Sequence, residues 1–172
     1  MSEHHLVRQL RFTRNEFIRG LDGVAAADGI RRLAPLNSIG WMVGHLANQE
    51  HGYWVVLAQQ KVLFPGLRDL VGTGKPASTP PLGDRLATWR AVTREADAYL
   101  DTLTPELALT FLRRGGSHGE ENVGTLLLRT IYHYWFHTGE AAAVRQLLGH
   151  ASRPEFVGPM GAATYEADDR LS

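Results

Sequence analysis

The chain has 172 residues, no cysteine, and 18 basic against 18 acidic side chains, so its formal net charge is zero with neutral histidines. This length fits a single domain, expected over residues 1–172, that is large enough to bury a core. The absence of cysteine excludes disulfide bonds, cysteine-ligated zinc and a thiol nucleophile on the chain itself. The balanced charge argues against nucleic acid or an anionic membrane as a partner, because both are attracted to basic surfaces.

The first residues do not have the pattern of a targeting segment. Residues 1–10 are charged and helical in character, unlike a signal peptide. No apolar run approaches the roughly 18 residues that a membrane span requires. We therefore expect a soluble, cytoplasmic protein.

Two helices are predicted in the first third of the chain. The first runs from about residue 3 to residue 22, with apolar side chains mostly four and seven residues apart, and glycines mark its end. The second begins at Asn37 or Ser38, either of which can cap a helix, and continues to about Leu57. Apolar residues occupy almost every side of this second helix, which predicts that it is buried against several neighbours.

The rest of the chain contains a long irregular segment and two further predicted helices. Residues 64–83 hold four of the eight prolines, and a segment of this length suits a crossover between parallel helices. The third helix is predicted from about residue 84 to residue 103. A glycine-rich connector at 115–119 leads to the fourth, from about residue 121 to residue 148. Because no convincing β-alternation is present, the prediction is an all-α four-helix bundle.

Three of the eight histidines lie in the middle of predicted helices among large apolar residues: His45, His133 and His137. His133 and His137 are four residues apart, so they share one helix face and can converge on one ion at roughly 2.0–2.1 Å. A third ligand must come from another helix, and His45 is the only other histidine in such a context. The alternative is a set of hydrogen-bonded core histidines, although three neutral imidazoles packed together are costly without a cation or good partners.

Two neighbouring residues refine the metal hypothesis. A zincin requires glutamate directly after its first histidine, and Tyr134 occupies that position, so the chain is not a zincin. Glu140 lies three residues after His137 on the same face. It is a candidate catalytic residue, either supporting a ligand or acting as a base through water. The alternative for Glu140 is a solvent-facing helix residue.

Two segments resemble the DinB-like superfamily of bundle proteins, which includes thiol-dependent S-transferases and maleylpyruvate isomerase. Residues 37–50 are similar to the family's second helix with its ligand histidine, and residues 133–140 are similar to its His-x-x-x-His-x-Gly-Gln motif. The family often has Arg-Gly-Gln after the last histidine, where this chain has Thr138, Gly139 and Glu140. The resemblance implies an up-down-down-up bundle with a long connection between helices two and three. It also implies a zinc- or nickel-like ion on the three histidines, and a homodimer.

Three protein ligands leave a divalent ion with an open position, as in catalytic sites. We therefore expect a metal-dependent enzyme that activates a low-molecular-weight thiol or water for transfer to, or hydrolysis of, a small-molecule substrate. Substrate is expected to approach from the end of the bundle near Arg31, Arg32 and His118, although these arginines could simply be surface charges. The alternatives are a non-catalytic stress-response bundle that binds metal or a small ligand, and a structural dimer with a residual site.

Overall fold

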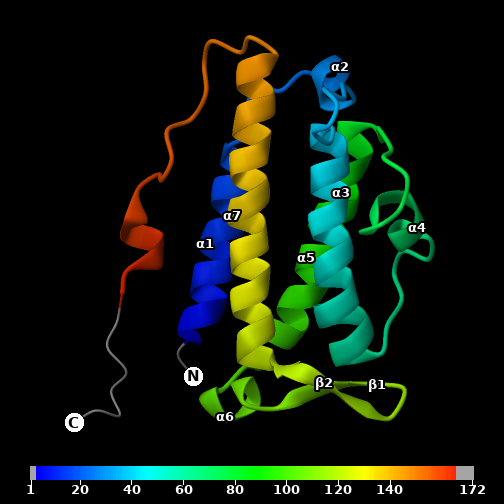
Figure 1. Ribbon diagram of the computed structural model, residues 1–172. Coiled ribbons are helices and arrows are strands. Elements are labelled where there is room, and N and C mark those ends of the chain that lie inside the picture. The colour runs from blue at the N-terminus through cyan, green and yellow to red at the C-terminus, as the bar shows by residue number, and fades with distance from the viewer. Residues whose placement is uncertain (1–2, 166–172) are drawn as a thin grey trace.

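The computed structural model describes residues 3–165 and shows long helices lying side by side (Figure 1). The prediction of a mostly helical chain is confirmed. The long helices are α1 (His5–Arg19), α3 (Ile39–Glu50), α5 (Leu82–Leu100) and α7 (Val123–Leu147). The short elements are α2 (Ala26–Gly29), the π-helical turn η1 (His51–Leu57), α4 (Leu67–Val71), α6 (Pro105–Ala108), the strands β1 (Phe111–Arg114) and β2 (Ser117–Asn122), and the 3-10 helix η2 (Met160–Ala163).

The segment before α7, predicted as a glycine-rich connector, contains the one pair of strands in the described part of the chain. Strands β1 and β2 form an antiparallel hairpin in which Arg114 pairs with Ser117. Gly115 and Gly116 make the turn with φ of 55° and 87°, a conformation that glycine adopts without strain. The hairpin also moves the start of the last helix from the predicted residue 121 to Val123.

Contacts between the long helices show their relative directions. Asn37, just before α3, contacts Glu140 late in α7, whereas Gln49 near the end of α3 contacts His133 earlier in α7. These two helices are therefore antiparallel. Helices α3 and α5 run in the same direction, so residues 60–81, which include α4, carry the chain back along the bundle (Figure 1).

Helix α3 lies at the centre of the core. Every residue from Ile39 to Ala47 is buried, because α5, α7 and α4 all pack against this helix. These neighbours explain why apolar residues occupy nearly every side of α3. Gly40 permits one close approach, since a Cβ there would lie 2.2 Å from the carbonyl oxygen of Pro80. The returning segment can therefore cross directly over the first turn of α3.

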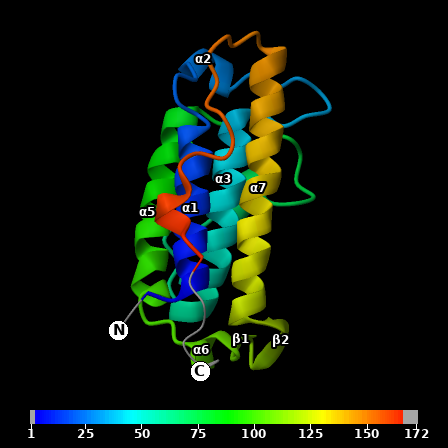
Figure 2. The same cartoon turned by 90° about the vertical axis from the view of Figure 1, so that its left-hand side faces the viewer.

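The segment after α7 packs along α1 (Figure 2). Arg19 donates a hydrogen bond to the carbonyl of Glu155 at 2.6 Å, and the backbone N–H of Gly158 donates to Glu16 at 2.8 Å. These contacts bind residues 155–158 to the outside of the bundle. Within residues 3–165, no helix is both long enough and apolar enough to cross a membrane.

Candidate metal centre

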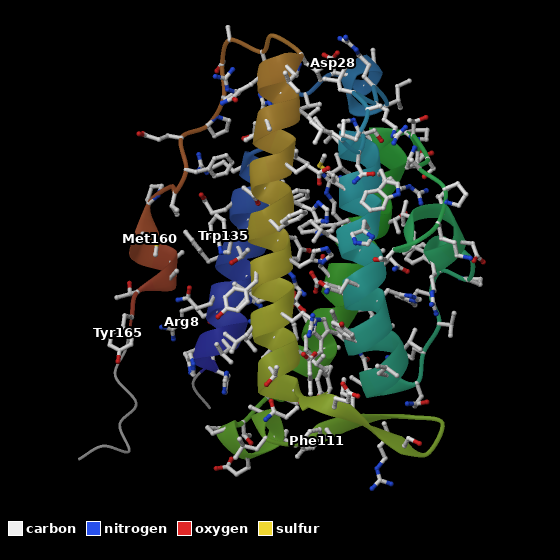
Figure 3. The ribbon with its side chains drawn as sticks, in the orientation of Figure 1. Arg8, Asp28, Phe111, Trp135, Met160 and Tyr165 are labelled. Carbon is white, nitrogen blue, oxygen red and sulfur yellow. The ribbon has the colours of Figure 1, made fainter. Side chains whose placement is uncertain are left out.

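Helices α3 and α7 bring the three predicted histidines together inside the bundle. His45 and His137 are buried, at 7% and 3% exposure, and His133 is partly buried. Their ligand nitrogen atoms all lie within 4.8 Å of one another, and they are the one such group among the side chains that the structure describes. The Nε2 atoms of His133 and His137 are 3.0 Å apart. Side chains fill the space between α7 and α3 (Figure 3).

Local packing orients each ring. His133 and His137 lie one turn apart on α7, so both face α3. Trp41, one turn before His45 on α3, stacks on the His45 ring with centroids 4.4 Å apart and planes 13° apart. The His45 ring in turn meets the other two rings edge-on. Helix geometry and one aromatic stack therefore hold the three imidazoles around a common point.

An oxygen atom stands beside the Nδ1 atom of every one of these rings. His45 Nδ1 lies 2.7 Å from the carbonyl oxygen of Val71, and His133 Nδ1 lies 2.8 Å from Oε1 of Gln49. His137 Nδ1 lies 2.8 Å from Oε2 of Glu140. These oxygens accept hydrogen bonds, so each Nδ1 carries the proton and each Nε2 keeps a free lone pair.

With the proton on Nδ1, none of the three Nε2 atoms can donate a hydrogen bond to another histidine. The two Nε2 atoms that lie 3.0 Å apart both present lone pairs, so the contact between His133 and His137 requires a cation or an added proton. Two nitrogens bound to one ion at about 2.0–2.1 Å are separated by about 2.8–3.4 Å for bond angles near 90–110°. The three Nε2 atoms therefore fit a divalent metal ion. The oxygens that accept hydrogen bonds from the Nδ1 atoms are of the kind that accompany metal-bound histidine.

Burial favours the neutral form of His45 and of His133. Burial lowers the pKa of His45, and burial together with the neighbouring His137, His45 and Arg129 lowers the pKa of His133 to about 3. Burial alone would raise the pKa of Glu140, but hydrogen bonds from His137 and Asn37 bring it below its ordinary value. Neutral imidazoles and an ionised outer carboxylate are the protonation states that metal binding requires.

We expect the metal-free protein to lose stability as the pH falls from about 6.5 toward 3. In this window the unfolded chain protonates His133 with its ordinary pKa of 6.5, while the folded-state pKa is about 3. The unfolded state then binds more protons, so the free energy of unfolding decreases as the pH is lowered; above both pKa values this residue adds no pH dependence. Urea unfolding with a chelator present, across this range, measures the effect. His133→Asn should make the decline shallower, and an unchanged decline would contradict the assignment.

An open groove of about 620 Å³ leads to the histidines, with walls that include His45, His133, Gln49, Tyr53 and Tyr132. It lies on the side of the β-hairpin, since Glu121 of β2 also lines it. Of the approach expected near Arg31, Arg32 and His118, the groove therefore coincides only with the hairpin that carries His118. Neither arginine lines this groove, and Arg31 pairs with Asp28 on the surface. The backbone of His118 lies in β2, and its side chain is outside the described part of the structure.

Glu140 is not a freely solvated side chain. Only 12% of it is exposed, and Oε1 accepts from the backbone N–H and the side-chain amide of Asn37 at 3.2 and 3.3 Å. Sequence reasoning missed Asn37, Gln49 and Val71 as partners of this site. The sequence does indicate Gln49, because it follows His45 by one helical turn. No sequence pattern could indicate the carbonyl of Val71, because every residue has a backbone carbonyl.

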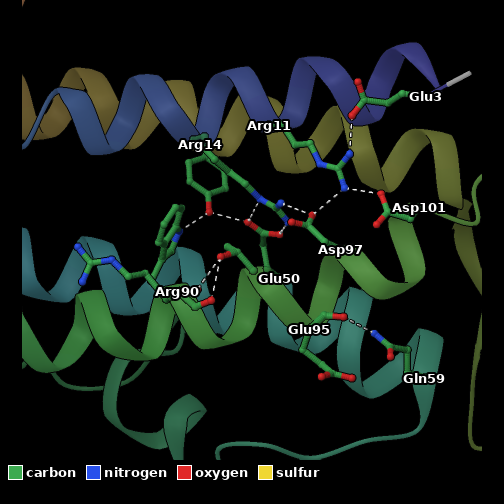
Figure 4. A network of polar contacts seen from close by, with 12 residues as sticks. Glu3, Arg11, Arg14, Glu50, Gln59, Arg90, Glu95, Asp97 and Asp101 are labelled. Carbon is green, nitrogen blue, oxygen red and sulfur yellow. Dashed lines mark hydrogen bonds and ion pairs between the residues drawn. The ribbon is translucent and has the colours of Figure 1, made fainter. Parts of the chain in front are cut away.

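A buried polar network beside the histidines was also missed (Figure 4). Arg14 of α1 forms a two-point ion pair with Glu50, which also accepts a 2.5 Å hydrogen bond from Tyr134. Trp89 of α5 donates to the Tyr134 hydroxyl at 2.6 Å. Glu50 follows Gln49, and Tyr134 follows His133. The network therefore joins α3 and α7 at the level where Gln49 contacts His133.

The chain was also compared with known protein families. A family model described as the DinB superfamily matches residues 9–141, a range that contains the three histidines and Glu140. A search of curated proteins found no match.

Proposed function

This chain belongs to the DinB superfamily, and we propose that it binds one divalent metal ion, of the zinc or nickel type, through His45, His133 and His137. The observation that carries this proposal is the set of three oxygen acceptors at the Nδ1 atoms. Together they direct three Nε2 lone pairs toward one another, which is unfavourable without a cation. We further propose the up-down-down-up bundle of this superfamily as the topology.

The proposed activity is that of a metal-dependent enzyme acting on a small molecule. A divalent ion held by three neutral imidazoles supplies Lewis acidity and an open position, and so favours the deprotonated form of a thiol or water. The chain's own residues exclude bulk water around His45 and His137 and hold the rings in place. The groove admits a small substrate, and because the chain has no cysteine, a sulfur nucleophile must come from a low-molecular-weight thiol.

The contacts of Glu140 favour a positioning role for it over proton transfer, because both of its oxygens already accept hydrogen bonds. We expect Glu140→Ala to lower metal affinity by about 10–100-fold, the usual cost of losing an outer partner. Glu140→Gln should recover part of the loss, since its amide oxygen can still accept from His137. Glu95→Ala, which removes a carboxylate paired with Lys61 elsewhere, is the matched control. Calorimetric titration of metal-free protein measures all three, and equal affinities would contradict this role.

Two measurements test the proposed function. Metal-free protein titrated with Zn²⁺, Ni²⁺ and Mn²⁺ should bind one ion per chain, and failure to bind any of them would refute the proposal. The nickel-loaded protein should then develop a saturable thiolate-to-metal absorption band with a small thiol such as N-acetylcysteine. A loaded protein that shows neither this band nor an exchangeable water has a closed coordination sphere. That result would favour the non-catalytic metal-binding alternative.

A further inference from the structure

The groove that leads to the histidines runs between two antiparallel helices, and each helix contributes a row of side chains to it. Along α3 and its continuation η1 the row is His45, Gln49 and Tyr53, at intervals of four residues. Along α7 the row is His133, Arg129 and Thr125, at the same interval in the opposite direction. Both rows therefore lead from the histidines toward the hairpin, which lies below these helices in Figure 1.

The dimensions of the groove suit a small molecule. The eight residues that separate Tyr53 from His45 correspond to about 12 Å along the helix. The volume of about 620 Å³ is that of an ordinary small-molecule site. One ligand can therefore place one end at the histidines and the other end beside the hairpin.

Two tyrosines from opposite helices line the middle of the groove. Tyr53 belongs to η1, where its ring meets Trp54 edge-on with centroids 5.8 Å apart. Tyr132 belongs to α7 and is 64% exposed, and Leu128 lies one turn before it. Aromatic rings attract other flat rings by stacked and edge-on contacts, which contribute more than the area they bury. These walls favour a ligand with a flat aromatic body over a ligand of equal size that is not flat.

The charges that line the groove neutralise each other. Among the described residues of its walls, Glu121 is the one acid and Arg129 the one guanidinium, and they form an ion pair. Nε of Arg129 donates to Oε2 of Glu121 at 2.8 Å, and Nη2 donates to Oε1. These hydrogen bonds raise the pKa of Arg129 and lower the pKa of Glu121. A ligand carboxylate here is repelled by Glu121, and a ligand ammonium by Arg129, so the ion pair favours an uncharged ligand.

We propose that this groove selects an uncharged small molecule with a flat aromatic body, which lies between Tyr53 and Tyr132 with its polar end toward the histidines. Tyr53 and Tyr132 select the ring, and the pair of Glu121 with Arg129 rejects charged analogues. The binding of the ring needs no metal. That this molecule is the substrate of the metal site rests on the proposed function.

Binding without metal or sulfur tests the preference for a ring. Metal-free protein titrated with 2-phenylethanol should show saturable shifts of labelled tyrosine signals in NMR spectra. Its dissociation constant should be about two- to tenfold lower than that of 2-cyclohexylethanol, which is equally large but not flat. Tyr132→Leu should remove this difference, whereas Tyr165→Leu, at an 88% exposed ring after α7, should retain it. Equal or tighter binding of the cyclohexyl alcohol by the wild type, or binding of neither, overturns the proposal.

A charged analogue tests the ion pair. 4-(2-Hydroxyethyl)benzoate has the same ring with a carboxylate at its far end, and should bind about threefold or more weakly than 2-phenylethanol. Glu121→Gln should reverse this order, because the freed Arg129 can bind the carboxylate at two points. Glu120→Gln is the matched control, since neighbouring residues of a strand face opposite sides. Wild-type protein that binds both compounds equally, or a Glu121→Gln protein that behaves like Glu120→Gln, contradicts selection by this pair.

Nickel-loaded protein separates this inference from the proposed function. The thiolate-to-metal band should appear at lower concentrations of 2-phenylethanethiol than of 2-cyclohexylethanethiol. A band of equal affinity for the two thiols refutes the aromatic ligand and leaves the proposed function standing. If no thiol gives a band while the metal-free protein still prefers 2-phenylethanol, thiol activation is refuted and the aromatic ligand stands.

Discussion

Replacing His137 by alanine is expected to abolish stoichiometric binding of divalent metal while the helices remain folded. The change removes one of three ligands and also removes the ring that Glu140 contacts at 2.8 Å. The loss should therefore exceed the roughly 10–100-fold expected when an outer partner alone is removed. Calorimetric titration with Zn²⁺ and elemental analysis of the purified protein measure the affinity and the stoichiometry, and circular dichroism reports the fold.

A second buried histidine provides the control for this prediction. His51 follows α3 directly, is 6% exposed, and accepts a hydrogen bond at Nε2 from the backbone N–H of Leu63 at 3.1 Å. His51→Gln preserves an acceptor and should bind metal like the wild type, whereas His45→Ala and His133→Ala should behave like His137→Ala. If His137→Ala kept wild-type affinity, or if His51→Gln lost as much, the assignment of the three ligands would be wrong.

Replacing Arg14 by methionine is expected to lower the free energy of unfolding by about 3–5 kcal/mol, the usual cost of breaking a buried ion pair. Arg14 is 4% exposed and Glu50 is fully buried. Without the guanidinium, the Glu50 carboxylate keeps only the hydrogen bond from Tyr134, and Asp97 loses its 2.7 Å contact with Arg14. Urea unfolding followed by tryptophan fluorescence measures the loss.

Two further variants distinguish the stability cost of an unpaired buried charge from the cost of losing an ion pair as such. Arg11→Met breaks ion pairs with Glu3 and Asp101 at a side chain that is 31% exposed, and should cost less than about 1 kcal/mol. Arg14→Met combined with Glu50→Leu should be more stable than Arg14→Met alone, because the unpaired carboxylate is gone. Equal losses for Arg11→Met and Arg14→Met would show that burial does not govern this network.

The long helices and the pairing of two of the three histidines were predictable because they depend on local sequence. Apolar spacing predicted the long helices, and a helix places residues four apart on one face, which paired His133 with His137. The hairpin before α7 was missed although Gly115-Gly116 is a strong turn signal. Its strands are short, and β2 (Ser117–Asn122) is polar throughout, so no alternation marks it. Glycines in this position are equally typical of a simple connector between helices.

Tertiary structure alone decided what surrounds the histidines. The order and spacing of residues predicted which three imidazoles were candidates, yet their proton positions depend on Gln49, Glu140 and the carbonyl of Val71. Val71 lies 26 residues after His45 and contributes a backbone atom that every residue type carries. The groove likewise opens toward the hairpin only because β2 packs beneath α7. Side-chain periodicity reports which face of a helix is buried, whereas these partners depend on how separate segments meet in space.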